Sequence, residues 1–258
     1  MRLTFLGTGT SFGVPQVGCA CAVCRSDDPR DKRTRVGAYV ESGGTRLLID
    51  TPPELRLQLI AAGITKVDAV LYTHEHADHT HGIDDVRPLS FGGALPMYGP
   101  AETLAVLEDR FPYIFDQSTK PLPGTSRPEG TATPLTAGKT IRIGTLDVTP
   151  FEVPHGRTRV FGYRIGPLAY VTDAKELPPS AVEILRGAKV LVLNALFRRT
   201  HPTHLSVFEA VHAARLVGAE RTWLTHLTHE TAHAELEAEL PPDIRPAYDG
   251  LTVEIPVA

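Results

Sequence analysis

THEHADHTHG, residues 73–82, is the most informative stretch of this sequence. It places four histidines, one glutamate and one aspartate within ten positions. A packed core would have to satisfy each of these strongly hydrated side chains by hydrogen bonding, and a surface loop gains nothing from them. Imidazole nitrogens and carboxylates are good ligands for zinc, iron or manganese. We therefore interpret the stretch as a metal site.

The residues before this stretch indicate how its side chains are presented. The run VDAVLYT, residues 67–73, is almost continuously apolar, as expected for a strand buried on both faces. Extended backbone would point His74 and His76 to the same side, and a helical turn after them would direct Asp78 and His79 toward the same space. Four ligands exceed the needs of one open site, which favours two adjacent ions. The alternative is a solvated polar loop. His81 breaks the spacing and is not assigned to the site.

The segment THEHADH is similar to the HxHxDH signature of the metallo-β-lactamase superfamily, where it also follows a buried strand. The resemblance covers essentially the whole chain. It implies an α/β protein with a four-layer αββα sandwich and a dinuclear metal site at the sandwich edge. It also implies a single metallo-hydrolase domain over residues 1–258.

Further ligands of this family are expected at the ends of later strands. His155, Asp173 and His226 each follow an apolar run, in the order in which the family's later ligands occur. Taken singly, His155 could also be a turn histidine, and Asp173 could be a helix N-cap. The resemblance assigns the ligands to two zinc or manganese ions bridged by Asp173: one is held by His74, His76 and His155, and the other by Asp78, His79 and His226.

The cysteines point to a second kind of metal site. All three, Cys19, Cys21 and Cys24, lie in GCACAVC, which is a poor disulfide framework because adjacent bridges would be strained and one thiol would remain. A structural zinc requires four ligands in a closed tetrahedron. We assign His229 as the fourth ligand, with His233 as the substitute. The alternative is three reduced, unligated cysteines.

The N-terminal stretch LGTGTSFGVPQVGCACAVC and the closing AYDGL resemble a narrower group, the phosphoribosyl 1,2-cyclic phosphate phosphodiesterases of the phosphonate pathway. A pyrroloquinoline quinone biosynthesis member of the superfamily carries a similar cysteine loop, but the full ligand set here favours hydrolysis. The resemblance implies a metal-dependent phosphodiesterase that cleaves a small cyclic phosphodiester with a metal-bridging hydroxide. The alternatives are a nuclease like the tRNA 3′-processing endonucleases and a non-catalytic metal-binding accessory protein.

Two residues are predicted to take part in catalysis. His204, in HPTHLS, matches a family histidine near the scissile phosphate, placed to protonate the leaving oxygen. Asp78 would orient the hydroxide as well as bind metal. His201 is interpreted as a loop residue. Four arginines near the ligands could hold phosphate oxygens, although solvated surface charge explains each of them as well; they are Arg157, Arg159, Arg198 and Arg199.

Composition and charge indicate which partners and which cellular location to expect. The chain of 258 residues is 42% hydrophobic and has a formal net charge of −4, so bulk charge does not favour nucleic acid or anionic membranes. The first residues lack the pattern of a signal peptide, and no apolar run is long enough to span a bilayer. We expect a cytoplasmic protein whose partner is a small phosphodiester substrate, with a homodimer left open and no further cofactor.

The remaining pattern is that of alternating strands and helices. Short apolar or β-branched runs between glycines and prolines are typical of strands, and they lie at 2–7, 37–42, 45–50, 67–73, 141–144, 146–153, 160–166, 168–173, 188–195, 221–226 and 251–257. Helical periodicity is found at 53–62, 101–110, 179–186, 206–217 and 230–240. Ser206 and Glu209 have the spacing of a capping box. Residues 116–139 are expected to form a long loop.

Overall fold

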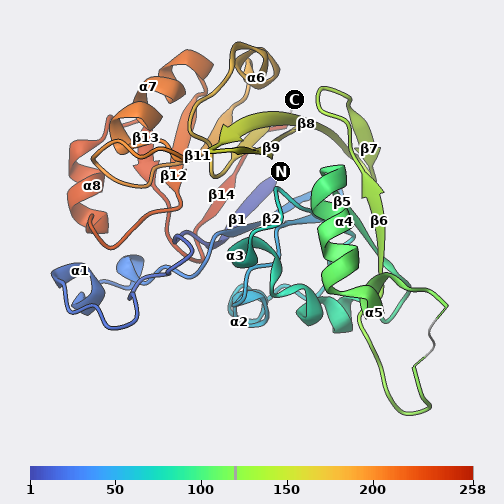
Figure 1. Ribbon diagram of the computed structural model, residues 1–258. Coiled ribbons are helices and arrows are strands. Elements are labelled where there is room, and N and C mark those ends of the chain that lie inside the picture. The colour runs from blue at the N-terminus through green and yellow to red at the C-terminus, as the bar shows by residue number, and fades with distance from the viewer. Residues whose placement is uncertain (119–120, 258) are drawn as a thin grey trace.

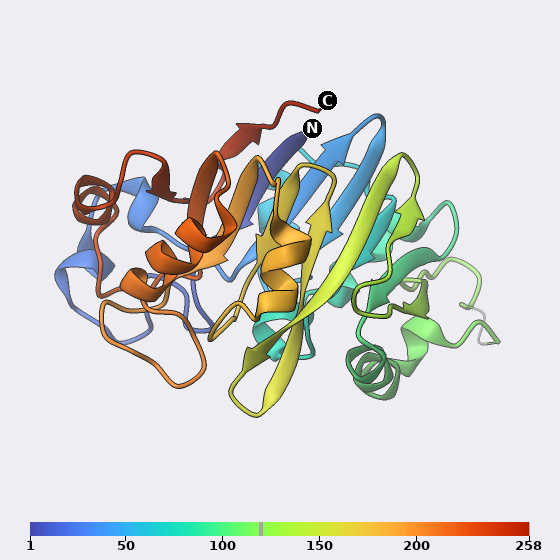
Figure 2. The ribbon, with the colours of Figure 1, turned by 90° about the horizontal axis from the view of Figure 1, so that it is seen from above.

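The computed structural model describes residues 1–118 and 121–257, and within them two seven-stranded sheets face each other (Figure 1). The first sheet has the order β14-β1-β2-β3-β4-β5-β6. Its strands are β1 (Arg2–Gly7), β2 (Gly37–Ser42), β3 (Thr45–Ile49), β4 (Ala69–Leu71), β5 (Leu95–Gly99), β6 (Gly130–Pro134) and β14 (Thr252–Glu254). Because β14 pairs antiparallel with β1, the two chain termini lie side by side (Figure 2).

The second sheet has the order β13-β12-β11-β10-β9-β8-β7. Its strands are β7 (Ile141–Ile143), β8 (Leu146–His155), β9 (Thr158–Ile165), β10 (Leu168–Val171), β11 (Val190–Asn194), β12 (Arg221–Thr225) and β13 (Ile244–Pro246). Strands β7 to β10 are antiparallel, whereas β10 to β13 run parallel. The central core, which includes Leu47 and Tyr163, lies between the two sheets.

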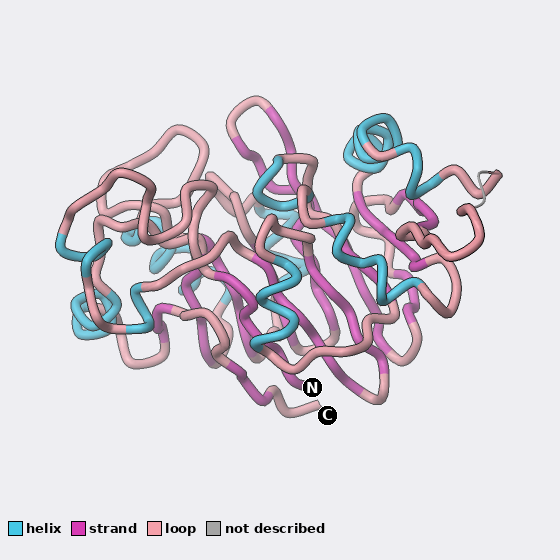
Figure 3. Tube along the Cα trace, turned by 90° about the horizontal axis from the view of Figure 1, so that it is seen from below, coloured by secondary structure: helices cyan, strands magenta, loops and turns pink. Residues whose placement is uncertain are grey.

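Helices cover the outer face of each sheet (Figures 1 and 3). On the first sheet, α2 (Leu55–Ala61), α4 (Ala101–Arg110) and α5 (Pro112–Phe115) bury apolar side chains in one outer core. On the second sheet, α6 (Pro179–Leu185), α7 (Val207–Val217) and α8 (His233–Glu239) do the same. The layers are therefore helix, sheet, sheet, helix, which confirms the αββα sandwich.

Several local patterns have the expected structural result. The side chain of Ser206 accepts a hydrogen bond from the backbone N–H of Glu209, and the Glu209 carboxylate accepts one from the backbone N–H of Ser206, so the capping box at the start of α7 is complete. Short helical turns fill the loops: α1 (Ala22–Arg25), α3 (Ala77–Thr80), η1 (Pro29–Asp31) and η2 (Ile83–Ser90). Within the described residues, no helix has the length and apolar character needed to span a membrane.

The prediction of a long loop over residues 116–139 is wrong for residues 130–134. Residues Gly130–Pro134 form β6, an edge strand that pairs in parallel with β5, itself not expected from the sequence. A Cβ on Gly130 would lie 2.9 Å from Cε of Met97, so a larger residue there would require the end of the Met97 side chain to move. Because β6 contains Gly130 and Pro134, its composition is typical of a loop, but both residue types are tolerated on an edge strand. Residues 119–120 lie outside the described part of the chain.

The fold brings two predicted ligands, Asp173 and His226, to one edge of the sandwich, together with Asp50, which the sequence analysis did not assign. Asp50 follows β3, Asp173 follows β10, and His226 follows β12. These three residues have positive φ angles of 62°, 57° and 59°, a backbone region that non-glycine residues rarely adopt. Such conformations persist only where the surrounding structure enforces them, and they cluster at functional sites.

Candidate metal centre

Two groups of three side chains converge at the sandwich edge. His74, His76 and His155 place one ligand atom each within 4.8 Å of one another, and Asp78, His79 and His226 do the same. These are the two triads that the sequence resemblance assigned to two separate ions. Strand β4 leads into the first triad, and the first turn of α3 carries Asp78 and His79, as expected from extended backbone followed by a helical turn.

Asp173 lies between the two triads and directs one oxygen toward each. Its Oδ1 lies 3.6 Å from Nε2 of His79 and 3.4 Å from Nε2 of His226. Its Oδ2 lies 3.8 Å from Nε2 of His74 and 3.9 Å from Nε2 of His155. A carboxylate in this position can bridge two cations.

Backbone and side-chain acceptors hold three of the imidazoles through their Nδ1 atoms. His74 Nδ1 lies 3.0 Å from the Thr73 hydroxyl oxygen, and His155 Nδ1 lies 3.1 Å from the Thr203 carbonyl oxygen. His79 Nδ1 lies 2.7 Å from Oδ2 of Asp50. With Nδ1–H donating outward, the Nε2 lone pair of each ring faces the centre, which is the arrangement that metal-binding histidines require.

Two buried polar residues that support this arrangement were not identified from the sequence. Asp50 accepts hydrogen bonds from the backbone N–H and the hydroxyl of Thr73, both at 2.8 Å, in addition to its contact with His79. Asn194 accepts from the Ala174 N–H at 2.8 Å and donates to the Ala174 carbonyl at 3.0 Å, which holds the turn after Asp173. For Asp50, the one sequence feature that could have indicated this role is its position at the end of an apolar run, which Asp173 shares.

The donor set fits divalent cations. His79 Nε2 and both ring nitrogens of His226 are buried without a hydrogen-bond partner, an arrangement that costs free energy unless another species completes it. Burial lowers the pKa of His226 to about 4 and also lowers that of His74, so both rings are neutral at pH 7. Burial alone would raise the pKa of Asp173, but the nearby His226 and His79 hold it well below its usual range. Neutral imidazoles and an ionised carboxylate are the ligating forms.

His204 extends the centre on one side. Its Nε2 lies 3.3 Å from Oδ2 of Asp173, and its ring stacks on that of His226 with centroids 4.8 Å apart. Its Nδ1 lies 2.8 Å from the hydroxyl oxygen of Thr203. His201, which was interpreted as a loop residue, also contacts this group, because its Nδ1 lies 3.2 Å from the same hydroxyl oxygen.

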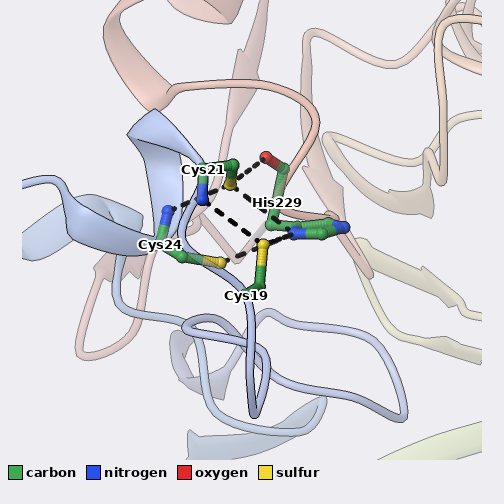
Figure 4. Close-up of side chains that lie close together, drawn as sticks. All are labelled: Cys19, Cys21, Cys24 and His229. Carbon is green, nitrogen blue, oxygen red and sulfur yellow. Dashed lines mark hydrogen bonds between the residues drawn. The ribbon is translucent and has the colours of Figure 1, made fainter.

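The cysteine loop forms a separate cluster with His229 (Figure 4). The Sγ atoms of Cys19, Cys21 and Cys24 lie 3.2, 3.6 and 3.5 Å from Nδ1 of His229. In a tetrahedral zinc site with bonds of about 2.3 Å to sulfur and about 2.0 Å to nitrogen, sulfur and nitrogen ligands lie about 3.5 Å apart. The four side chains therefore have the spacing of a closed zinc site.

The structure places His229, and not the substitute His233, beside the cysteines. His233 is buried at the start of α8 with its ring against Tyr248. The buried guanidinium of Arg33 donates to the carbonyls of Thr228 and Thr231, at 2.6 and 3.1 Å, and so holds the loop that carries His229.

The other candidate residues lie outside the two triads. His81 ends α3 and packs edge-on against Phe111. Three of the four arginines have carboxylate partners: Arg159 pairs with Glu152, Arg198 with Glu239 and Arg199 with Glu230. Arg157 is exposed in the turn between β8 and β9.

A cavity of about 480 Å³ adjoins the chain segments that carry the first triad. Glu75, between His74 and His76, lines it, as does Thr158, whose hydroxyl donates to the His155 carbonyl at 2.9 Å. Glu102, Glu152 and Arg159 also line it. Three carboxylates against one guanidinium give the cavity an acidic lining.

Comparison with known proteins gives a family match and a relative of similar sequence. The model of the family described as the Beta-lactamase superfamily domain matches residues 45–227. A protein of Porphyromonas gingivalis named octanoyltransferase is 40% identical over 257 residues, which cover 97% of this chain and 51% of that protein. This chain therefore spans about half the length of that relative.

Two solved structures are similar over nearly the whole chain. The crystal structure of a diphosphatase from the PhnP family superimposes with a TM-score of 0.91 at 41% identity, covering 99% of this chain and 98% of that one. Zinc-bound PqqB from Methylobacterium extorquens has a TM-score of 0.79 at 20% identity and covers 99% of this chain and 100% of that one. At that level of identity, the second likeness establishes the fold alone.

Proposed function

This chain belongs to the metallo-β-lactamase superfamily and is a hydrolase-fold relative of the PhnP family, and we propose that it is a dinuclear phosphodiesterase acting on a small cyclic phosphodiester. The observation that carries the proposal is the position of Asp173 between two triads, with Nε2 of His204 within 3.3 Å of its carboxylate. Ligands for two cations and a proton donor thus surround one point at the sandwich edge.

The residues present would divide the chemistry among them. His74, His76 and His155 would hold one divalent ion, Asp78, His79 and His226 the other, and Asp173 would bridge them. Two such ions, zinc or manganese, supply a hydroxide nucleophile at neutral pH and neutralise charge on the phosphate. Asp78, at the start of α3, would also orient the nucleophile.

His204 would complete the reaction on the leaving-group side. As a new P–O bond forms to the nucleophile, the ester P–O bond breaks and its electron pair goes to the leaving alkoxide oxygen. That oxygen needs a proton, which the imidazolium form of His204 can give from Nε2, the nitrogen that faces the centre, leaving a neutral ring.

The neighbouring cavity supports a small substrate. A volume of about 480 Å³ accommodates a sugar-sized group beside the first triad. A diphosphatase cleaves a phosphoanhydride P–O bond and a phosphodiesterase an ester P–O bond, but both react by attack at phosphorus, so the related diphosphatase supports phosphorus chemistry without deciding between these two substrates.

The cysteine cluster would hold one structural zinc in the same protein. Cys24 lies on α1, Cys21 and Cys19 precede that helix, and His229 lies on the loop after β12, in a group that shares no residue with the two triads. We assign it no part in bond cleavage, because a closed set of four ligands leaves no open position.

The test is a comparison of leaving groups in His204→Ala. Leaving-group protonation contributes about 10²–10⁴-fold, so we expect a loss in that range for a small alkyl cyclic phosphate. The loss should shrink for bis(p-nitrophenyl) phosphate, because p-nitrophenolate scarcely needs a proton. Metal content should stay unchanged. His81→Ala, in the same motif stretch but outside both triads, is the matched control and should behave like wild type.

Other results would contradict the proposal. Efficient cleavage of precursor tRNA together with inert small cyclic phosphates would identify a nuclease. Cleavage of a nucleoside diphosphate ester alone would identify a diphosphatase. Fully metal-loaded protein that cleaves none of these substrates, including the small cyclic phosphate and bis(p-nitrophenyl) phosphate, would indicate an accessory protein.

A further inference from the structure

Thr203 contacts three parts of the centre at once. Its carbonyl accepts from Nδ1 of His155, and its hydroxyl oxygen lies 2.8 Å from Nδ1 of His204. Its methyl group faces the turn between β8 and β9, where a Cβ on Gly156 would lie 2.8 Å from Thr203 Cγ2. The residue therefore links the loop that carries His204 to the turn that follows a ligand of the first triad.

The backbone beside Thr203 is held in place on its other side. The Leu205 N–H donates to the Ala174 carbonyl at 2.8 Å, directly after Asp173, and Ser206 caps α7. With the backbone fixed on both sides of His204, rotation of the imidazole about its side-chain bonds is the main freedom left. Three contacts oppose this rotation: the Asp173 carboxylate at Nε2, the stacked ring of His226, and the Thr203 hydroxyl, which is the hydrogen bond at Nδ1.

The donor and acceptor groups around His204 indicate which partner donates the hydrogen bond between His204 and Thr203. Because an ionised Asp173 can only accept, His204 Nε2 must carry a proton in order to bond to it. In the neutral ring Nδ1 is then an acceptor, so the Thr203 hydroxyl donates its single proton to His204. His201 Nδ1 accepts from the Thr203 backbone N–H at 3.4 Å and lies 3.2 Å from the Thr203 hydroxyl oxygen, so we assign the hydroxyl proton to the shorter contact, with His204 at 2.8 Å.

We propose that Thr203 is a positioning residue that holds the His204 ring with Nε2–H directed at the leaving oxygen. The inference rests on the proposed role of His204 and adds a residue that the ligand set does not include. A hydroxyl suits the task because it can donate to the neutral ring and accept from the protonated one. Threonine adds a methyl group, which keeps the hydroxyl aligned by packing against Gly156.

A matched pair of substitutions separates the hydroxyl from the methyl group. Thr203→Val keeps the shape and removes the hydroxyl, whereas Thr203→Ser keeps the hydroxyl. Since a hydrogen bond of this kind accounts for about a tenfold factor, we expect Thr203→Val to lower kcat about tenfold for a small alkyl cyclic phosphate. Thr203→Ser should retain most of the activity, and KM and metal content should change little. Thr149→Val, in β8 and remote from the centre, is the control for the substitution itself.

A double-mutant cycle tests whether Thr203 acts through His204. In the His204→Ala background, Thr203→Val should cause no further loss, because its target is absent. An equal loss in both backgrounds, a Ser variant as impaired as the Val variant, or a fully active Val variant would each overturn the proposal.

A spectroscopic measurement decides the contact without relying on any substrate. In zinc-loaded protein with ¹⁵N-labelled histidine, the His204 Nδ1 resonance should show the upfield shift of a hydrogen-bond acceptor in wild type and in Thr203→Ser. It should move toward the position of a free imidazole nitrogen in Thr203→Val. An unchanged resonance would overturn the proposal. If wild-type protein cleaves no phosphodiester, the proposed function fails, while this measurement still decides the role of Thr203.

Discussion

Nδ1 of His79 lies 2.7 Å from Oδ2 of Asp50, and both side chains are completely buried. The same carboxylate accepts from the backbone N–H and the hydroxyl of Thr73. Asp50 therefore fixes His79, which belongs to the second triad, and Thr73, which directly precedes His74 of the first triad. A side chain that binds no ion directly holds the geometry of both triads.

Replacing Asp50 tests this relationship. Asp50→Asn keeps the size of the side chain but can turn an N–H toward His79 or Thr73, so we expect the affinity for divalent ions to fall about 10–100-fold. Competition with a metal chelator measures the change. Asp68→Asn, which breaks only an exposed pair with Arg46, should leave the affinity unchanged. Equal affinities in all three proteins would show that Asp50 does not support the triads.

Removing the carboxylate between the triads should affect both ions. Elemental analysis of purified protein should find close to three divalent ions per chain, at least one of them zinc. Asp173→Ala should lower the occupancy of both catalytic positions, because one oxygen of Asp173 faces each triad. Cys21→Ser should leave these two ions in place. A wild-type content of one ion or less after reconstitution would contradict the two-triad interpretation.

The cysteine cluster should contribute to stability more than to chemistry. Binding of structural zinc contributes to the free energy of folding, so Cys21→Ser and His229→Ala should lower both the zinc content and the Tm. Soluble variant protein with both catalytic ions should keep substantial turnover. His212→Ala, an exposed histidine on α7, is the control. A Cys21→Ser protein that binds all its zinc and melts like wild type would refute the assignment.

Asp249 should make stability depend on pH. Burial raises its pKa to about 6 in the folded protein, although Thr34 and Thr8 donate hydrogen bonds to it. The unfolded chain has a carboxyl pKa near 3.9, so between about pH 4 and 6 the folded state binds more protons. The contribution of Asp249 is therefore fully present below about pH 4 and is lost as pH rises through 6, by up to about 3 kcal/mol.

Urea unfolding of wild type and Asp249→Asn across this pH range measures the effect. The free energy of unfolding of wild type, relative to that of the variant, should fall between pH 4 and pH 6, because asparagine does not ionise. A difference that stays constant across the range would show that Asp249 keeps an ordinary pKa.

The sequence was sufficient wherever the deciding information is local. Strand burial before residue 73, the helical turn that carries Asp78 and His79, and the capping box at Ser206 depend on residues a few positions apart, and the structure shows each of them. The order of His155, Asp173 and His226 after apolar runs was visible for the same reason. Segments that rely on a neighbour were misread: β6 looks like loop because only its pairing with β5 makes it a strand.

Tertiary structure alone decided which distant side chains meet. Asp50 and His79 are 29 positions apart, and Thr203 and His155 are 48 apart, and neither pair was expected from the sequence. Between His229 and its substitute His233, the structure selected His229, which is 210 positions from Cys19. It also decided that three of the four arginines near the ligands engage carboxylates. The physical reason is that these contacts depend on strand register and on how the two sheets pack. Sequence spacing encodes the type of ligand, whereas the packing of the sheets selects the partner that holds each ligand in place.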